Sequence, residues 1–165
     1  MGSEMCIRDS PTTALCIEVM EEMLTVEPVD SVLDVGTGSG ILALAALMLG
    51  VPQAVGLDID PNALKVAGEN ARLNRVENRL KLMLGGPEVV EGGWPLVVAN
   101  VLAAPLIEMA PVLVRRLASD GRLVLSGIRS SMESEVRQAY QRFGVWCIES
   151  RTRAGWTVVI GRASW

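Results

Sequence analysis

The sequence predicts an α/β domain in which a mostly parallel, seven-stranded sheet carries helices on both faces and ends in an antiparallel hairpin. After Pro11, short apolar segments alternate with helical stretches, which is the pattern of a parallel sheet with covering helices. Pro95–Asn100 has a continuous Leu-Val-Val-Ala centre, as expected of a strand buried on both faces. A glycine-rich turn over residues 36–40 follows the first strand, so the sheet is expected to be Rossmann-like.

The chain begins with a helix and then a strand–helix unit. Apolar side chains recur at helical spacing from Thr12 to Leu24, and Glu27–Asp30 ends this helix. Ser31–Val35 is expected to be the first strand. Ile41–Leu49 is apolar on all sides and is closed by Gly50, so we expect a buried helix.

A second strand and helix follow. Gln53–Ile59 is the expected strand. Asp60 and Pro61 begin the helix, because aspartate caps backbone N–H groups and proline suits the first helical turn. This helix is expected to reach about Asn74, and Arg79–Leu84 is the expected third strand.

Pro95–Asn100 is the fourth strand and Arg122–Ser126 the fifth, with a helix between them. Apolar residues three and four positions apart mark that helix. Its stripe consists of Leu106, Met109, Ala110, Leu113 and Leu117.

The last helix and a hairpin complete the predicted fold. Ser131–Phe143 is the helix, and its apolar face consists of Val136, Ala139, Tyr140 and Phe143. Val145–Arg151 and Trp156–Gly161 are expected to be two strands of a hairpin that turns at Gly155.

Composition indicates one domain over residues 11–165. The chain of 165 residues is 50% hydrophobic, which is enough for a sizeable core. Residues 1–10 show neither helical nor strand periodicity, so a disordered or non-native leader is expected there. The longest apolar run, Ile41–Leu49, is far shorter than the roughly 20 residues that cross a bilayer, so we expect a cytoplasmic protein without a membrane contact.

The charge balance disfavours nucleic acid as a direct partner. The chain has 15 Lys and Arg against 19 Asp and Glu, and it contains no basic run. A basic protein partner would suit its net charge of −4. Cys6, Cys16 and Cys147 are odd in number and widely spaced, so reduced thiols are expected rather than a disulfide framework or a zinc site, and no metal is predicted. The oligomeric state is left open.

The turn Asp34–Gly40 reads Asp-Val-Gly-Thr-Gly-Ser-Gly and connects the first strand to the next helix. Its glycines allow a tight turn and close approach of a ligand, while free N–H groups at the helix start favour an anionic group. A dinucleotide fingerprint counted from Gly36 would have Gly or Ala where this chain has Ile41. The pattern therefore favours S-adenosylmethionine, bound through Gly36 and Gly38, over a nicotinamide cofactor. A tight connection without a ligand is the structural alternative.

Two polar residues at strand ends are further candidates for this site. Asp58 ends the second strand 22 positions after Gly36, near the roughly 20 expected of a carboxylate that binds ribose hydroxyls, whereas Asp60 is the expected helix cap. Asn100 ends the fourth strand, at the edge where open α/β sheets bind ligands, with a turn-forming residue as the alternative. No role is assigned to Trp94, Trp146, Trp156 or Trp165.

From Pro11 to Arg162, the chain resembles the catalytic domain of the PrmA-type methyltransferases of ribosomal protein L11. The glycine turn is common to many methyltransferases, whereas Pro11–Cys16 (Pro-Thr-Thr-Ala-Leu-Cys) and Asn100–Leu106 (Asn-Val-Leu-Ala-Ala-Pro-Leu) are specific to this family. The other matching segments are Asp34–Leu42, Asp58–Pro61, Glu69–Ala71, Val98–Ala99, Ser126–Ile128 and Gly161–Arg162.

The resemblance implies a class I methyltransferase fold and S-adenosylmethionine as the cofactor, contacted by Thr13, Gly36, Asp58 and Asn100. It also implies methylation of lysine or α-amino groups of a large-subunit ribosomal protein. In-line transfer to a neutral nitrogen needs alignment and desolvation more than a side-chain base. Asn100 is the candidate catalytic residue, because its side chain could accept a hydrogen bond that orients the nitrogen.

Two other functions stay open. The family has a separate N-terminal recognition domain and a His-containing loop before Pro-Thr-Thr, and these 165 residues contain neither, nor any histidine. A non-catalytic, cofactor-binding remnant is therefore one alternative. An NAD-dependent oxidoreductase, which would share the fold, is the other.

Overall fold

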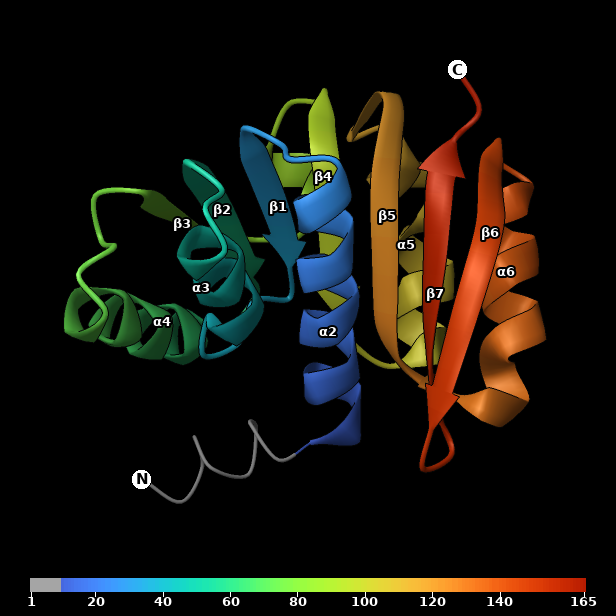
Figure 1. The fold of residues 1–165 in the computed structure, drawn as a ribbon, viewed down its shortest axis with the longest axis horizontal. Helices are drawn as coiled ribbons and strands as arrows, with labels where there is room; N and C mark the ends of the chain where they lie inside the picture. Colours follow the sequence, from blue (N-terminus) through green and yellow to red (C-terminus); the bar gives the residue numbers. More distant parts are fainter. Residues whose placement is uncertain (1–9) are drawn as a thin grey trace.

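The structure is a computed structural model that describes residues 10–165. Seven strands in this range form one sheet in the order β3-β2-β1-β4-β5-β7-β6 (Figure 1). They are β1 (Ser31–Val35), β2 (Gln53–Asp58), β3 (Leu80–Leu84), β4 (Trp94–Asn100), β5 (Leu117–Arg129), β6 (Val145–Arg153) and β7 (Trp156–Ala163). The leader predicted over residues 1–10 lies outside the described residues, apart from Ser10.

The sheet is parallel except at β7. β1 pairs in parallel with β2 and β4, β2 with β3, and β4 with β5. β7 inserts between β5 and β6 and is antiparallel to both. The turn from β6 to β7 uses Ala154 and Gly155, whose φ angles of 51° and 79° suit a two-residue hairpin. The predicted seven-stranded, mostly parallel sheet and its C-terminal hairpin are confirmed.

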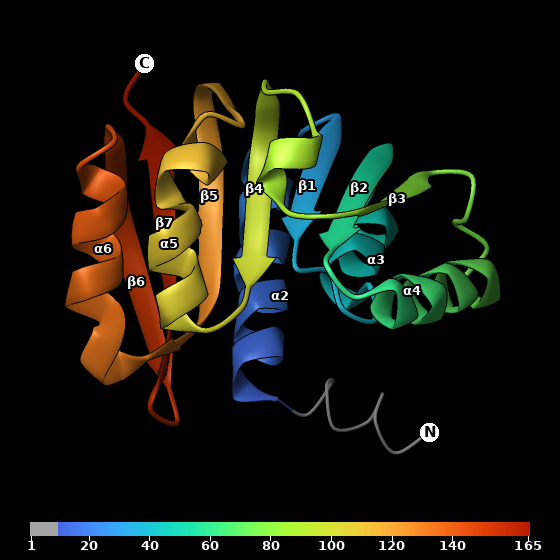
Figure 2. The same cartoon turned by 180° about the vertical axis from the view of Figure 1, so that it is seen from behind.

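Helices cover both faces of the sheet, as predicted. α2, α3 and α4 lie on the face seen in Figure 1, and α5 and α6 lie on the face seen in Figure 2. Their bounds are α2 (Pro11–Val26), α3 (Ile41–Met48), α4 (Pro61–Leu73), α5 (Ala103–Val114) and α6 (Glu133–Gln141), with short 3-10 turns at Pro87–Val89 and Ser130–Met132. None of the helices within residues 10–165 has both the length and the apolar character needed to cross a membrane.

Each helical layer packs its own core against the sheet. Met20 of α2 is fully buried on one face, and Leu106 of α5 and Tyr140 of α6 are fully buried on the other. Neighbouring residues of β1 divide between the two cores, because Val32 belongs to the first and Leu33 to the second. Strands buried on both faces explain why apolar residues run continuously in this sequence rather than alternating with polar ones.

The expected helical stripe is wrong at its last residue. α5 ends at Val114, and Leu117 is the first residue of β5. The Arg116 carbonyl accepts a hydrogen bond of 2.8 Å from the backbone N–H of Trp94, so the chain is already joining β4 at this point. The spacing from Leu113 to Leu117 fits a helix, but pairing with β4 determines the structure of Leu117.

Three other expectations fail at the ends of elements. Phe143 lies beyond α6 and is 42% exposed, since the chain turns at Gly144 with a φ of 90°. Ile59 lies beyond β2 and is 81% exposed. α3 is not buried on all sides, because Met48 in its last turn is 66% exposed.

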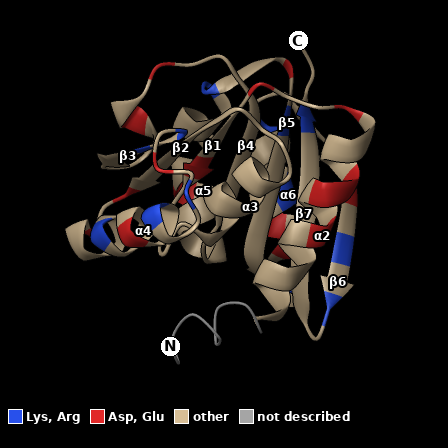
Figure 3. Cartoon of the chain, turned by 60° about the vertical axis from the view of Figure 1, so that its left-hand side comes forward, with Lys and Arg blue, Asp and Glu red and all other residues tan. Residues whose placement is uncertain are grey.

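Ion pairs connect α2 to the hairpin. Arg153 contacts Glu18 through two bonds of 2.7 and 2.9 Å, and Arg151 contacts Glu22 at 2.7 Å. Figure 3 shows the acidic positions of α2 beside basic positions of β6. Exposed pairs of this kind contribute only about 0–1 kcal/mol each. They join α2 to β6 without adding much to stability.

Candidate functional site

The predicted site residues gather at one edge of the sheet, where β1, β2 and β4 end. β1 and β4 are neighbours, with Val35 opposite Ala99, so the glycine turn after β1 lies beside Asn100 at the end of β4. Strand order reverses between β1 and β4, which is where open α/β sheets form their ligand crevice. The N-terminus of α2 lies at the same edge (Figure 1), and Thr13 near this end of the helix is hydrogen-bonded to Asn100.

The glycine turn needs glycine at the positions that the sequence indicated. Gly36, Gly38 and Gly40 have φ angles of 72°, 56° and 85°, in the left-handed region that other residues rarely adopt. A Cβ on Gly36 would lie 2.6 Å from Cγ1 of Val101, whereas a Cβ on Gly38 would meet no atom within 4 Å. The turn is therefore packed against β4 at Gly36 and open to a ligand at Gly38.

Asp34, in β1 just before this turn, holds the turn in place through hydrogen bonds, although it was not among the predicted cofactor contacts. It is 1% exposed, and one carboxylate oxygen accepts from the Thr37 hydroxyl at 2.7 Å and from the Ala43 N–H at 3.2 Å. Burial raises the pKa of Asp34 to about 6, and the charge of Asp58 raises it further. The two hydrogen bonds act in the opposite direction and lower this pKa. A buried carboxylate thus ties the turn to the start of α3.

The free energy of unfolding is expected to fall as pH rises from about 4 to about 6, because of Asp34. Its pKa is about 6 in the folded protein against an ordinary value of 3.8 for aspartate, so the folded state binds more protons in this window. The shift corresponds to on the order of 3 kcal/mol, lost as pH rises and constant above about pH 6. Asp34→Asn keeps an acceptor but cannot ionise, so its stability relative to the parent should increase across the window. Chemical denaturation of both proteins at several pH values measures this, and a pH-independent difference would contradict it.

Asp58 closes the turn from the neighbouring strand. Its two carboxylate oxygens accept from the backbone N–H groups of Gly38 at 2.8 Å and of Asp60 at 3.0 Å. Asp60 caps α4 by accepting from the Asn62 N–H at 2.9 Å, which confirms the predicted cap. The expectation of free N–H groups for an anionic ligand is wrong at Gly38, because that group is bound to a carboxylate. The negative charge would repel a pyrophosphate, while it can still accept hydrogen bonds from hydroxyl groups.

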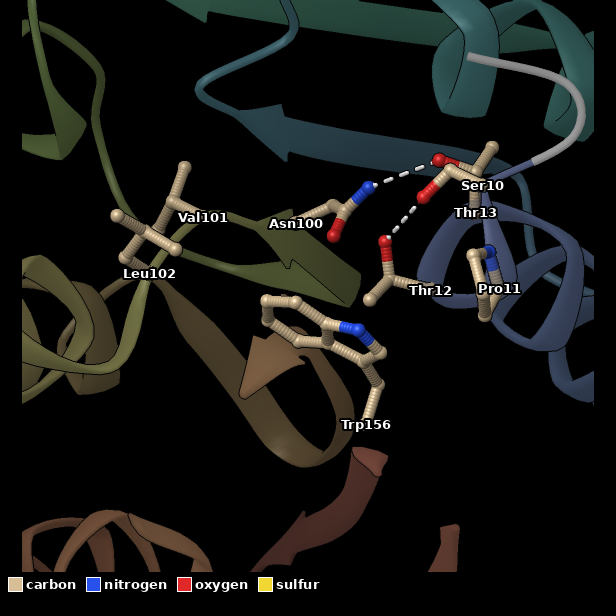
Figure 4. Close-up of a pocket in the computed structure, with 9 residues that line it drawn as sticks. Ser10, Pro11, Thr12, Thr13, Asn100, Val101, Leu102 and Trp156 are labelled. Atoms are coloured by element: carbon tan, nitrogen blue, oxygen red, sulfur yellow. Dashed lines mark hydrogen bonds between the residues drawn. The ribbon is translucent and has the colours of Figure 1, made fainter. Parts of the chain in front are cut away.

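Asn100 and Thr13 meet at a cavity of about 520 Å³ between α2 and the end of β4. The Asn100 side-chain amide donates to the Thr13 hydroxyl at 3.2 Å. Figure 4 shows Asn100, Thr12 and Trp156 around the same space, with Leu102 at its far side. Among the described residues, those that line this cavity carry no ionisable side chain, and their polar groups are hydroxyls, an amide and an indole N–H. Within residues 10–165, no cluster of three or more His, Cys, Asp or Glu side chains could hold a metal ion.

Trp156, for which the sequence indicated no role, forms a wall of this cavity. It is the first residue of β7 and lies opposite Arg129 in the β5–β7 pairing. The guanidinium of Arg129 stacks over the indole at 4.5 Å from the ring centroid, which fixes the ring. The only sequence signal was the position of Trp156 directly after the hairpin turn, and the pairing with β5 was needed to place it.

The predicted residues therefore fall into two connected groups at one edge. Gly38 and Asp58 are hydrogen-bonded to each other, and Gly36 lies beside them against Val101. Thr13 and Asn100 form the second group, next to the cavity. The first group presents backbone and a carboxylate, which suit a sugar, and the second presents an amide beside an aromatic wall, which suits a reacting group.

Comparison with known proteins finds one matching family. The model of that family, ribosomal protein L11 methyltransferase (PrmA), matches residues 9–164. A ribosomal protein L11 methyltransferase of Geobacter sulfurreducens is 43% identical over 152 residues, covering 92% of this chain and 49% of the relative. One from Nitrosomonas europaea is 43% identical over 163 residues, covering 93% of this chain and 51% of the relative. The chain thus spans about half the length of these relatives.

Solved structures show the same architecture. A ribosomal protein L11 methylase from Lactobacillus delbrueckii subsp. bulgaricus superposes with a TM-score of 0.85 at 32% identity, covering 93% of this chain and 80% of the other. An RNA methyltransferase from Salinibacter ruber, solved in complex with S-adenosyl-L-homocysteine, has a TM-score of 0.71 at 22% identity, with 93% of each chain covered. The second likeness concerns the fold alone.

Proposed function

This chain belongs to the ribosomal protein L11 methyltransferase (PrmA) family, and from that premise we propose that it methylates amino groups of ribosomal protein L11 with S-adenosylmethionine. The observation that carries the proposal is the placement of Asp58 and of the Thr13–Asn100 pair at one edge of a methyltransferase-type sheet. The net charge of −4 supports a protein acceptor rather than nucleic acid. The relatives named as methyltransferases of a ribosomal protein support the cytoplasm as the compartment.

The chain's residues suit the parts of this cofactor. Asp58 would accept hydrogen bonds from the ribose hydroxyls, and Gly38, where no atom blocks the α-carbon, would let the cofactor lie against the backbone. Ile59, 81% exposed directly after Asp58, offers an apolar surface for the base. Gly36 keeps the turn close to β4, and Thr13 covers the site from α2.

S-adenosylmethionine supplies an electrophilic methyl group when it is bound. Asn100 would accept a hydrogen bond from the attacking amine through its side-chain oxygen, since its amide nitrogen is held by Thr13. Trp156 and Leu102 would exclude water around the amine. These roles amount to orientation and desolvation, and the amine would lose its proton to water before attack.

The pKa of the acceptor amine, rather than that of an enzyme group, is expected to set the pH dependence of methyl transfer. A lysine amine has a pKa near 10.4 and an α-amine one of about 7.7 to 8.0. Between pH 8.5 and 9.5 the rate should rise about ninefold for a lysine acceptor, but only about 1.2-fold for an α-amine. Initial rates with L11 peptides acetylated either at the α-amine or at lysines would identify the nitrogen. One identical profile for both peptides would contradict this expectation.

Transfer of labelled methyl groups to purified ribosomal protein L11 tests the proposed function itself. Labelled L11, together with saturable binding of S-adenosylmethionine in calorimetry, is the expected result. Binding without transfer to L11 or to free amines would favour the non-catalytic alternative. Binding of NAD in place of S-adenosylmethionine would favour the oxidoreductase.

A further inference from the structure

Ser126 is a buried hydroxyl at an otherwise apolar position of the sheet. It is 0% exposed, and the residues before it in β5, Leu123, Val124 and Leu125, are buried and apolar. Its hydroxyl donates to the backbone carbonyl of Thr12 at 3.1 Å. Burying a hydroxyl is unfavourable unless it is hydrogen-bonded, so this bond to α2 is what makes a serine tolerable here.

The bond reaches the one part of α2 that borders the site. Thr12 lines the cavity, and the adjacent Thr13 accepts from Asn100. Asn100 and Ser126 are direct partners in the β4–β5 pairing. The first turn of α2 is therefore attached to two neighbouring strands, through Asn100 on β4 and Ser126 on β5.

The first turn of α2 has a favourable proline, Pro11, at its first position, but it has no side-chain cap. The side chain of Ser10, at the N-cap position, makes no capping hydrogen bond, and the first turn contains no acidic residue. Uncapped helix ends fray readily, so the position of the turn depends on bonds from the sheet. Of the two side-chain hydrogen bonds that attach this turn to β4 and β5, the one from the Ser126 hydroxyl is fully buried and the one from Asn100 is partly buried.

The backbone beside Ser126 is shaped to allow this arrangement. The β5–β7 pairing shifts register between Leu125 and Ile128. Gly127 within this irregularity has a φ of 81°, and a Cβ there would collide with the Val101 carbonyl and lie 3.1 Å from the Asn100 side-chain oxygen. The irregularity thus brings β5 close beneath Asn100 while Ser126 bonds α2.

We propose that Ser126 is a positioning residue, whose hydroxyl holds the first turn of α2 so that Thr13 and Asn100 keep their places at the site. The proposal rests on the proposed function, in which Thr13 and Asn100 face the cofactor and the amine. Ser126 itself is too deeply buried to touch either ligand.

Ser126→Ala tests this role, with Tyr140→Phe as the matched control. Tyr140 also uses a buried hydroxyl to bond a helix carbonyl, that of Leu106 at 2.8 Å, but on the opposite face of the sheet. Ser126→Ala is expected to weaken S-adenosylmethionine binding about 3- to 10-fold in calorimetry, as befits one neutral hydrogen bond. Tyr140→Phe should leave the affinity unchanged even where it lowers the unfolding temperature. Ser126→Thr, which keeps the hydroxyl, should bind S-adenosylmethionine more tightly than Ser126→Ala and with an affinity close to that of the parent.

Amide hydrogen exchange provides a readout that needs no cofactor. Exchange at residues 13–16 should be several-fold faster in Ser126→Ala than in the parent, and unchanged in Tyr140→Phe. Equal effects of the two substitutions on affinity, or unchanged exchange at residues 13–16 in Ser126→Ala, would overturn the proposal. If the parent chain binds no S-adenosylmethionine, the proposed function fails, and the exchange comparison still decides whether Ser126 holds the turn.

Discussion

Asp58→Ala is expected to weaken S-adenosylmethionine binding by about 100-fold, which corresponds to about 2.7 kcal/mol. Hydrogen bonds to a charged group contribute about 1.5 to 3 kcal/mol, and the carboxylate would bind ribose hydroxyls while it also holds the N–H of Gly38. The substitution removes both effects, because the turn loses its link to β2 together with the ligand's acceptor. Calorimetric titration with S-adenosylmethionine measures the loss.

Asp60→Ala is the matched control for that experiment. Asp60 lies two residues from Asp58, but its side chain accepts from Asn62 at the start of α4. Its removal should cost about 1 kcal/mol of folding stability, as for other helix caps. Cofactor affinity should stay within about twofold of that of the parent. Comparable losses of affinity in the two variants would mean that the acidic pair acts through α4 rather than through the sugar.

Asn100→Ala should lower the rate of methyl transfer at saturating cofactor by about 100-fold, while cofactor affinity changes far less. A misplaced reacting group costs about this much in rate, and Asn100 is the polar side chain at the end of β4 that the proposed mechanism uses to orient the amine. Single-turnover transfer to L11, with the cofactor bound beforehand, separates this effect from binding.

Thr13→Val serves as the companion variant. It preserves the shape of the side chain but removes the hydroxyl that accepts from Asn100, so the amide loses its partner without being deleted. A loss of rate of about tenfold is expected, between the parent and Asn100→Ala. An unchanged rate in Asn100→Ala would return Asn100 to the simpler role of a turn-forming residue.

The parts of the fold that depend on local chemistry could be predicted from the sequence. The bounds of β1 agree with those of the structure, the cap at Asp60 is present, and the hairpin turns at Gly155. Local features also located much of the candidate site, because the ends of parallel strands must meet at one edge. Gly36, Gly38, Asp58 and Asn100 follow from that rule.

The remainder depends on register between distant strands, which no local pattern encodes. Trp156 borders the cavity because β7 pairs with β5 across a register shift. Leu117 lies in β5, and not in the predicted helix, because it pairs with Trp94 of β4. The same holds for Ser126, whose bond partner Thr12 is 114 residues away. Apolar spacing identifies helices and strands, but it does not show which distant residues face each other.

The insertion of β7 between β5 and β6 has a consequence for the order in which the protein can be assembled during synthesis. β6 has no other neighbour in the sheet, so it cannot join until β7 has left the ribosome and occupied the gap. Val158, Val159 and Ile160 of β7 then close both cores at once. Trp156 arrives with them, so the cavity wall is completed only after the six preceding strands have been translated.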